Sequence, residues 1–316
     1  MKNFSIIAVL IVLFAQSVKG QFVGEYTQYM IVKSAYNPGA IALTDMASAS
    51  AIHHQQWVGF PGAPMDTYLS FNMPFSLWKK HQIGAGIMLQ NKKMGLFSEQ
   101  TVELAGSYKF ALFEGMLSVG TNVGMVNVSF AGDSVKIPKG DNYHTASDPF
   151  IPTSRVNGMA FDVSLGAFYT ANTWYAGVSV LNITSPTIRW SDTQSTYVGR
   201  MLYLMGGYDF SLSNPSYVFK PSMLIKTNFI TYQADVNLVG EYQDKYWGGV
   251  GFRVGDAFMI LAGVRLANGL SIGYSFDLPL TQIITSSYGS HELTLTYDFK
   301  LSFDKRNSKY KSVRLL

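Results

Sequence analysis

The 316-residue chain contains no cysteine, and only 14% of its residues are charged. Without cysteine, the chain forms no disulfide, holds no metal through a thiolate and cannot be anchored as a lipoprotein through a lipidated cysteine. A typical soluble domain carries about 25% charged residues. The shortage of charge therefore indicates either a large core or a surface that faces lipid.

Long hydrophobic runs are also missing after residue 20, where no stretch approaches the roughly 18 residues that a membrane helix needs. The one apolar run is at the start, where Lys2 precedes FSIIAVLIVLFA and the small residues Val18 and Gly20 follow it. This order predicts a cleaved secretory signal over residues 1–20, with Gln21 as the first mature residue. An N-terminal membrane anchor is the alternative, but the segment is short and no charged stop follows it.

The formal net charge of +4 is concentrated at the two ends of the chain. Lys2 and Lys19 leave with the predicted signal, and residues 304–316 carry five basic residues against one acidic residue. The remaining body, residues 20–303, therefore has a formal net charge of −2. A nearly neutral body offers no basic surface for nucleic acid, so we expect no nucleic-acid partner.

What the chain has in abundance is alternation with a period of two. In HELTLTYDFKLSF, residues 291–303, apolar residues occupy every second position from Leu293 to Phe303. Such alternation predicts a strand with one apolar and one polar face. Most of these runs have about the ten residues that a tilted membrane strand requires. Fourteen runs follow the pattern, at residues 44–57, 65–74, 81–91, 98–110, 115–130, 156–170, 173–183, 199–211, 216–226, 230–242, 245–254, 257–266, 269–279 and 289–303.

The connections between the runs differ in length by parity. Even-numbered links are mostly tight, whereas the odd-numbered links include the long ones at 131–155, 184–198 and 280–288. Short periplasmic turns, longer outer loops and aromatic girdles are typical of outer-membrane barrels. The aromatic residues gather beside the short links, as Tyr108 with Phe110, Tyr169 with Trp174 and Tyr175, and Tyr242 with Tyr246 and Trp247.

These patterns predict an all-β fold, a transmembrane antiparallel β-barrel of about 14 strands over residues 44–303, located in the Gram-negative outer membrane. An even strand count places both mature termini in the periplasm. Residues 21–43 alternate poorly and are expected at the periplasmic mouth or in the lumen, and residues 304–316 are expected to form a basic periplasmic tail. A soluble β-sandwich or propeller would alternate too, but it should not sort its loops by parity.

The sequence gives little support for a catalytic site or a metal site. His53 and His54 face opposite sides of a strand, so they do not easily bind one metal together. No G-x-S-x-G nucleophile motif is present, and the carboxylates Asp235 and Asp277 are explained as the polar side of a wet interior. We therefore expect no enzyme activity, no cofactor and no bound metal.

The stretch QQWVGFPGAP forms the first link between strands, on the outer side by the parity rule. Pro61 and Pro64 stiffen its backbone, and Gly59 and Gly62 permit positive φ. Trp57 is suited to the outer lipid interface. The physical interpretation is a rigid outer turn.

This stretch resembles the Q-W-x-G-x-x-G-A-P signature of the type IX secretion system membrane protein family PorP/SprF of Bacteroidetes. YTQYMIVKSAYNPGA resembles the N-terminal motif of that family, although Gly39 stands where alanine is usual. KPSMLIK, QADVNL and YWGGVGFR resemble its later strands, and IGYSFDLPLTQIITSSYGSHELTLTYDF resembles its C-terminal signature. His53 and His54 depart from the family, in which arginine is common just before the Gln-Trp pair, so a contact that depends on this arginine is in doubt.

The resemblance implies an outer-membrane barrel of the type IX protein secretion and gliding machinery. Such a barrel supports export or surface attachment of large cargo proteins, often adhesins, by binding their C-terminal domains, and it contacts other secretion components, including periplasmic or peptidoglycan-linked proteins. A porin or a fatty-acid-type transport channel is the competing function. The candidate partner-binding residues are Gln56, Trp57, Gly59, Gly62, Ala63 and Pro64 of the first link, Asn37 and Pro38, and Lys305, Arg306, Lys309 and Lys311 of the tail.

Overall fold

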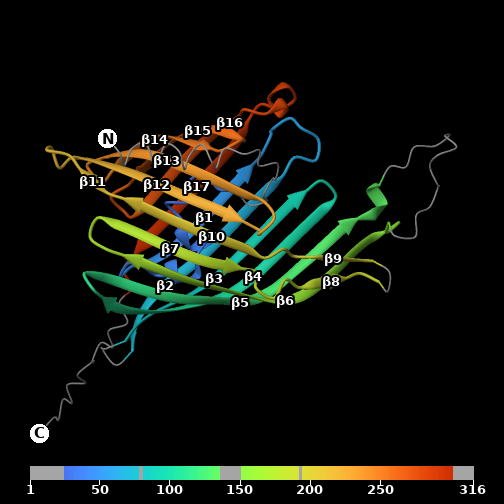
Figure 1. The fold of residues 1–316 in the computed structure, drawn as a ribbon, viewed down its shortest axis with the longest axis horizontal. Coiled ribbons are helices and arrows are strands. Elements are labelled where there is room, and N and C mark those ends of the chain that lie inside the picture. The colour runs from blue at the N-terminus through green and yellow to red at the C-terminus, as the bar shows by residue number, and fades with distance from the viewer. Residues whose placement is uncertain (1–24, 78–80, 136–150, 192–193, 302–316) are drawn as a thin grey trace, which may run out of the picture.

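A computed structural model describes residues 25–77, 81–135, 151–191 and 194–301. Its main sheet closes on itself, so the predicted antiparallel barrel of about 14 strands is confirmed (Figure 1). In the described residues, no helix has the length and apolar character needed to cross a membrane. The wall strands are β1 (Ala47–Gln55), β2 (Met65–Leu77), β3 (His81–Met94), β4 (Phe97–Leu112), β5 (Gly115–Ala131), β6 (Arg155–Thr170), β7 (Trp174–Leu181), β10 (Met201–Tyr208) with its extension β11 (Phe210–Ser211), β12 (Tyr217–Thr227), β13 (Tyr232–Tyr242), β14 (Tyr246–Arg253), β15 (Ala257–Arg265), β16 (Leu270–Pro279) and β17 (Ser290–Phe299).

The barrel closes where the first strand meets the last. β1 pairs with β17 in an antiparallel register that runs from Ala47 opposite Phe299 to Gln55 opposite His291. The long links, 132–154, 182–200 and 280–289, all leave one end of the barrel, which we call the loop end. β1 begins and β17 ends at the opposite end, which we call the turn end and which carries short links such as 113–114 and 243–245. The sorting of the links by parity is therefore confirmed.

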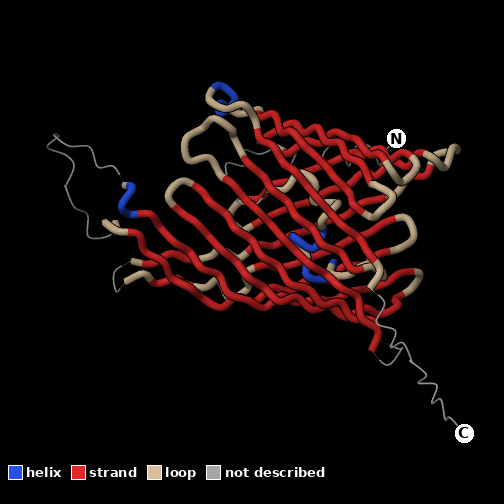
Figure 2. Tube along the Cα trace, turned by 180° about the vertical axis from the view of Figure 1, so that it is seen from behind, coloured by secondary structure: helices blue, strands red, loops and turns tan. Residues whose placement is uncertain are grey.

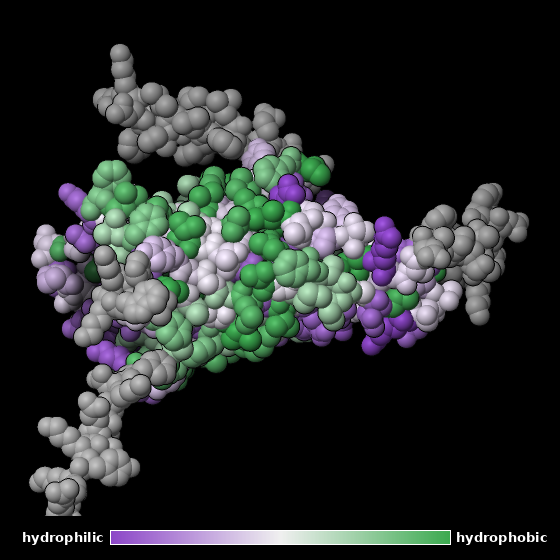
Figure 3. Space-filling view, turned by 90° about the horizontal axis from the view of Figure 1, so that it is seen from below, coloured by the Kyte–Doolittle hydropathy of each residue, from purple (hydrophilic) through white to green (hydrophobic). Residues whose placement is uncertain are grey.

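Most outward positions of the strands are apolar, as the alternation predicts, although some inward positions, such as Leu224 and Met259, are apolar too. On β17, the outward Leu293 and Tyr297 are 44% and 43% exposed, whereas the inward Glu292 and Thr294 are each 1% exposed. On the face seen in Figure 3, apolar side chains form a belt across the middle of the molecule, with polar residues gathered toward its ends. Such an exposed apolar belt matches the lipid-facing band of a membrane barrel.

The aromatic residues beside the short links fall into two groups. Tyr169 and Trp174 pack with ring centroids 5.0 Å apart on the outer face, and Tyr242 packs on Tyr217 in the same way at 4.8 Å. Tyr175 and Trp247 instead point inward, because each lies one position out of step with its outward neighbours on β7 and β14. The prediction that these two residues join the girdle was wrong.

The wall is taller on one side. β4, β5 and β6 have 16, 17 and 16 residues, whereas β7, β10 and β14 have 8 each. A hairpin of β8 (Thr187–Arg189) and β9 (Ser195–Tyr197) lies beside the extended strands (Figure 1). Its Ile188 packs with Val126 and Val128 of β5 in a small buried cluster. The hairpin occupies the region that the alternation predicts only as a long link.

Residues 25–43 lie inside the barrel, and we call this segment the plug. Two short turns, η1 (Lys33–Ala35) and η2 (Pro38–Ala40), appear in the lumen in Figure 2. Tyr29, Tyr36 and Ile41 of the plug are almost completely buried and pack with inward residues of the wall. The sequence left two locations open for this segment, the periplasmic mouth and the lumen. Residues 25–43 lie in the lumen.

Candidate functional site

A buried network of charges fastens the plug at the loop end. The guanidinium group of Arg253 on β14 contacts Glu25 of the plug at 3.3 Å, Asp235 on β13 at 3.3 Å and Asp277 on β16 at 3.2 Å. Lys226 on β12 reaches Asp235 at 3.0 Å and Glu25 at 3.9 Å. Burying charges is unfavourable unless they are paired. Burial raises the pKa of the Glu25 carboxyl above its ordinary value, while Lys226 and Arg253 act in the opposite direction.

Hydrogen bonds from the next plug residues extend this network. The backbone N–H groups of Thr27 and Gln28 donate to the Glu292 carboxylate at 2.7 and 2.9 Å. The Thr27 hydroxyl donates to Asp277 at 2.7 Å, and the Asn237 amide donates to the Thr27 carbonyl at 2.9 Å. The first described residues of the plug are therefore held by five wall strands, β12, β13, β14, β16 and β17.

The middle of the plug approaches the wall through a glycine. The Asn37 side chain accepts from the Gly39 N–H at 2.8 Å and donates to the carbonyls of Ala167 and Val178 at 3.0 and 3.2 Å. A Cβ on Gly39 would lie 2.8 Å from the Ser118 carbonyl oxygen and 2.9 Å from the Phe168 nitrogen. These backbone atoms cannot easily move aside to make room for a Cβ. Glycine therefore fits this position better than the alanine that is usual in the family.

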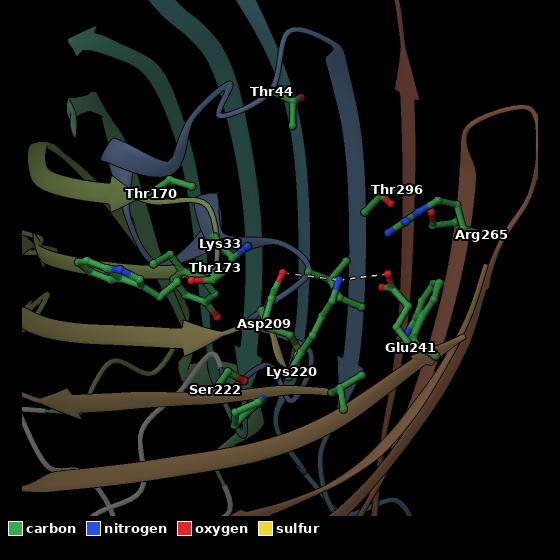
Figure 4. A pocket seen from close by; sticks show the side chains of 18 of the residues that line it. Lys33, Thr44, Thr170, Thr173, Asp209, Lys220, Ser222, Glu241, Arg265 and Thr296 are labelled. Carbon is green, nitrogen blue, oxygen red and sulfur yellow. Dashed lines mark ion pairs between the residues drawn. The ribbon is translucent and has the colours of Figure 1, made fainter. Parts of the chain in front are cut away.

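Below the plug, a cavity of about 480 Å³ occupies the lumen at the turn end (Figure 4). We call it the chamber. The Lys220 side chain extends into the chamber, and its ammonium lies 3.1 Å from Glu241 and 4.0 Å from Asp209. Lys33 of the plug enters from the other side, its ammonium 4.4 Å from the centroid of the Tyr175 ring. Hydroxyl groups, Arg265 and Asp298 supply the rest of the polar lining, and apolar side chains such as Ile31, Val239 and Trp247 supply about half of the chamber surface.

A smaller cavity of about 80 Å³ separates the plug from the β3–β6 side of the wall. Tyr26, Tyr68 and Tyr203 line it, together with the ion pair of Lys92 and Glu99 at 3.0 Å. The smaller cavity is mainly polar, whereas the chamber is polar and apolar in about equal parts.

The first link is a stiff turn, as its composition predicts. Gly59 and Gly62 have φ of +93° and +75°, and the Gln56 N–H donates to the Pro64 carbonyl at 2.9 Å. Trp57 also has a positive φ, +44°, and is half-buried, with its N–H donating to the Ser290 hydroxyl at 3.2 Å. The Ala63 N–H closes the turn on the Phe60 carbonyl at 3.1 Å.

This turn is joined to the last link and to the plug. The Val58 N–H donates to the Gly289 carbonyl at 2.8 Å, and the Tyr288 N–H returns a bond to the Val58 carbonyl at 2.7 Å. The buried Gln56 amide donates to the Glu25 carboxylate at 3.4 Å. The first link therefore forms one frame with residues 280–289 and the charged network.

The structure brings some predicted site residues together and separates others. Gln56, Trp57, Gly59, Gly62, Ala63 and Pro64 share the frame at the loop end, whereas Asn37 and Pro38 are buried deeper in the lumen against β5, β6 and β7. Lys305, Arg306, Lys309 and Lys311 lie outside the described residues.

The two adjacent histidines point in opposite directions, as expected for a strand. His53 faces outward and meets the Thr67 hydroxyl at 2.9 Å, whereas His54 is buried in the lumen against Tyr26. Within the described residues, no group of three or more His, Asp or Glu side chains is arranged to hold a metal ion.

Comparison with known proteins gives the family. The family described as type IX secretion system membrane protein PorP/SprF matches residues 18–297. The chain belongs to the PorP/SprF family. The match includes the plug, the frame and the wall strands up to residue 297 of β17. No curated relative of this PorP/SprF protein is found by sequence.

Solved structures resemble this PorP/SprF barrel in fold alone. The toluene transporter TbuX of Ralstonia pickettii aligns with a TM-score of 0.53 at 11% identity, over 91% of this chain and 97% of the other. A FadL homologue of Pseudomonas aeruginosa aligns with a TM-score of 0.45 at 13% identity, over 84% and 94% of the two chains.

Sequence reasoning missed the anchors of the plug and the chamber. Alternation does predict that Lys226, Arg253 and Glu292 face inward, each near the loop end of its strand. It does not reveal the stagger between neighbouring strands, which decides whether these side chains meet. Glu25 and Lys33 carry no periodic signal, because the plug forms no strand.

Proposed function

We propose that this PorP/SprF barrel supports export or surface attachment of large cargo proteins by binding their C-terminal domains at the loop end. The observation that carries the proposal is the fastened plug. A lumen filled by a plug that is tied to five strands is suited to a docking platform, whereas a conduit requires an open path.

The loop end offers features that a protein partner could use. Phe60, Ile284 and Tyr288 are 40%, 46% and 79% exposed on the frame of the first and last links. We call these three residues the rim patch. Aromatic and apolar side chains on a rigid support lose little entropy on binding and are typical anchors of protein interfaces. On the predicted orientation the rim patch faces the cell exterior, where surface cargo is retained.

A transport channel is the alternative that the sequence leaves open. A site for hydrophobic solutes is lined mainly by apolar side chains. The chamber instead mixes apolar side chains with the charged Lys33, Lys220 and Glu241 and many hydroxyl groups, and the plug lies between it and the loop end. We therefore favour docking, and we expect reconstituted protein to produce no large stable conductance in planar bilayers, whereas a porin would.

The basic tail is proposed to contact a periplasmic secretion or peptidoglycan-linked partner. Leu301, the last described residue, lies at the turn end, on the side opposite the rim patch. Exposed charges are screened beyond about 8 Å at physiological ionic strength, so contact through Lys305, Arg306, Lys309 and Lys311 should weaken with salt. Attraction to other anionic surfaces is the alternative role of the tail.

The test is affinity purification of tagged protein in mild detergent, with partners identified by mass spectrometry. Phe60→Ser combined with Tyr288→Ser should deplete cargo from the purified complex. Phe113→Ser is the matched control, because Phe113 is 92% exposed at the turn end. Truncation after Phe303 should deplete the periplasmic partners from the purified complex and leave cargo recovery unchanged. Unchanged cargo recovery from the rim variant would refute docking at this patch.

A further inference from the structure

The chamber contains a cation without a carboxylate partner. Among the described residues, no carboxylate oxygen lies within 4.0 Å of the Lys33 ammonium, and its close neighbour is the face of the Tyr175 ring. Lys220, across the same cavity, is paired with both Glu241 and Asp209. The two lysines therefore differ: one is already neutralised, and the other is available to an anion.

The environment of Lys33 is unfavourable to its charge. Burial lowers the pKa of the Lys33 ammonium to about 8, with the nearby Lys220 acting in the same direction and Asp209 opposing them. The Tyr175 ring offers cation–π attraction, which is weaker than a hydrogen-bonded ion pair. A bound anion would supply the missing counter-charge.

The chamber is also shaped for a ligand. Its volume of about 480 Å³ falls within the roughly 300–1,000 Å³ typical of small-molecule sites. Thr44, Thr173 and Ser222 present hydroxyl groups, and Lys33 reaches the same space from the plug (Figure 4). Such groups can hydrogen-bond a carboxylate and the polar atoms next to it.

We propose that the chamber binds a carboxylate-bearing ligand, with the Lys33 ammonium as its counter-ion and the Tyr175 ring beneath that ammonium. The Lys220 pair forms the polar wall opposite. Two sources supply this chemistry: the C-terminal carboxylate of an extended peptide that enters from the turn end, and a free small carboxylic acid. This site lies at the end of the barrel opposite the rim patch, so it is independent of the proposed cargo docking.

The experiment uses the full mature chain in detergent micelles and three probes: acetyl-Gly-Ser-Ala with a free carboxylate, the same peptide as its C-terminal amide, and sodium butyrate. Binding is measured by saturation-transfer NMR and calorimetry. We expect the acid peptide or butyrate to bind at least tenfold more tightly than the amide. Affinity should fall as pH rises from 7 to 9, because Lys33 loses its proton near pH 8.

Lys33→Gln should abolish the preference for the acid and flatten the pH profile. Lys245→Gln is the matched control, because its ammonium also lies over a tyrosine ring, that of Tyr246 at 5.0 Å, but outside the chamber lining. Heat-modifiable gel migration checks the folding of both variants. If Lys33→Gln does not fold, the acid-to-amide affinity ratio and the pH profile of the unaltered protein still test the carboxylate site.

Binding of the peptide acid without butyrate identifies a peptide end as the source, and butyrate competing with the peptide identifies a small acid. Either result supports the carboxylate site. Equal binding of acid and amide, an unchanged Lys33→Gln variant, or binding of none of the three probes at millimolar concentration overturns it.

Discussion

Glu25 and Arg253 come from opposite ends of the chain and meet in the lumen, with 3.3 Å between the Glu25 carboxylate and the Arg253 guanidinium. Arg253 also contacts Asp235 and Asp277, so a single cation balances carboxylates from the plug and from two strands. Arg253 therefore joins Lys226 in holding the start of the plug by charge pairing with Glu25.

Arg253→Leu should loosen the plug. Removal of the guanidinium leaves the buried Asp277 without its cation and Glu25 and Asp235 with Lys226 alone, and breaking a buried ion pair from one side costs about 3–5 kcal/mol. We expect a lower thermal midpoint in heat-modifiable gel migration and a gain of conductance in planar bilayers. Arg265→Leu is the control, because Arg265 is exposed at the turn end. Equal behaviour of the two variants would show that the network does not retain the plug.

Gly39→Ala should destabilise the packing of the plug without altering any charge. The added Cβ would meet backbone atoms of Ser118 and Phe168 within 3 Å. Overpacking of this kind typically costs about 1–3 kcal/mol. Gly106→Ala is the matched control on β4, where a Cβ meets no atom within 4 Å. Denaturant unfolding followed by tryptophan fluorescence should separate the two variants, and equal midpoints would contradict the close approach of Gly39.

The orientation of the barrel can be tested by cysteine labelling, with no background because the chain has no cysteine. Ser286 is exposed at the loop end and Glu114 at the turn end. Ser286→Cys should react with an impermeant maleimide on intact cells, and Glu114→Cys should react only after the outer membrane is opened. The reverse pattern would place the loop end in the periplasm.

Gly62→Val should affect cargo more than folding. Gly62 has φ of +75°, where a β-branched residue is strained by about 1–3 kcal/mol. The strain is local to the frame, so barrel folding should persist while cargo secretion or surface display falls. Gly255→Val tests specificity, since Gly255 has φ of +76° in another link at the same end. Loss of cargo in both variants, or loss of barrel folding in Gly62→Val, would remove the special role of the first link.

The elements that could be predicted from sequence are those governed by the pleat of a strand. Alternation gave the opposite directions of His53 and His54 and the inward position of Glu292 beside the outward Leu293. It could not reveal that Lys226 and Arg253 converge on Glu25, because convergence depends on the stagger between strands. Tyr175 and Trp247 were misplaced for a related reason: proximity to a turn indicates depth in the membrane, but only the register decides the face.

The long reach of the plug has a consequence for the order of assembly. The backbone of Thr27 and Gln28 bonds to Glu292 on the last strand, while β1, which follows the plug in sequence, closes the barrel against that same strand. Seam closure therefore waits for the final strand to be synthesised, and the plug gains one of its anchors only then. Contacts this distant in sequence make folding slow. A chain interrupted before β17 lacks its closing partner and the Glu292 anchor of its plug, so the strand that completes the barrel also strengthens the retention of its contents.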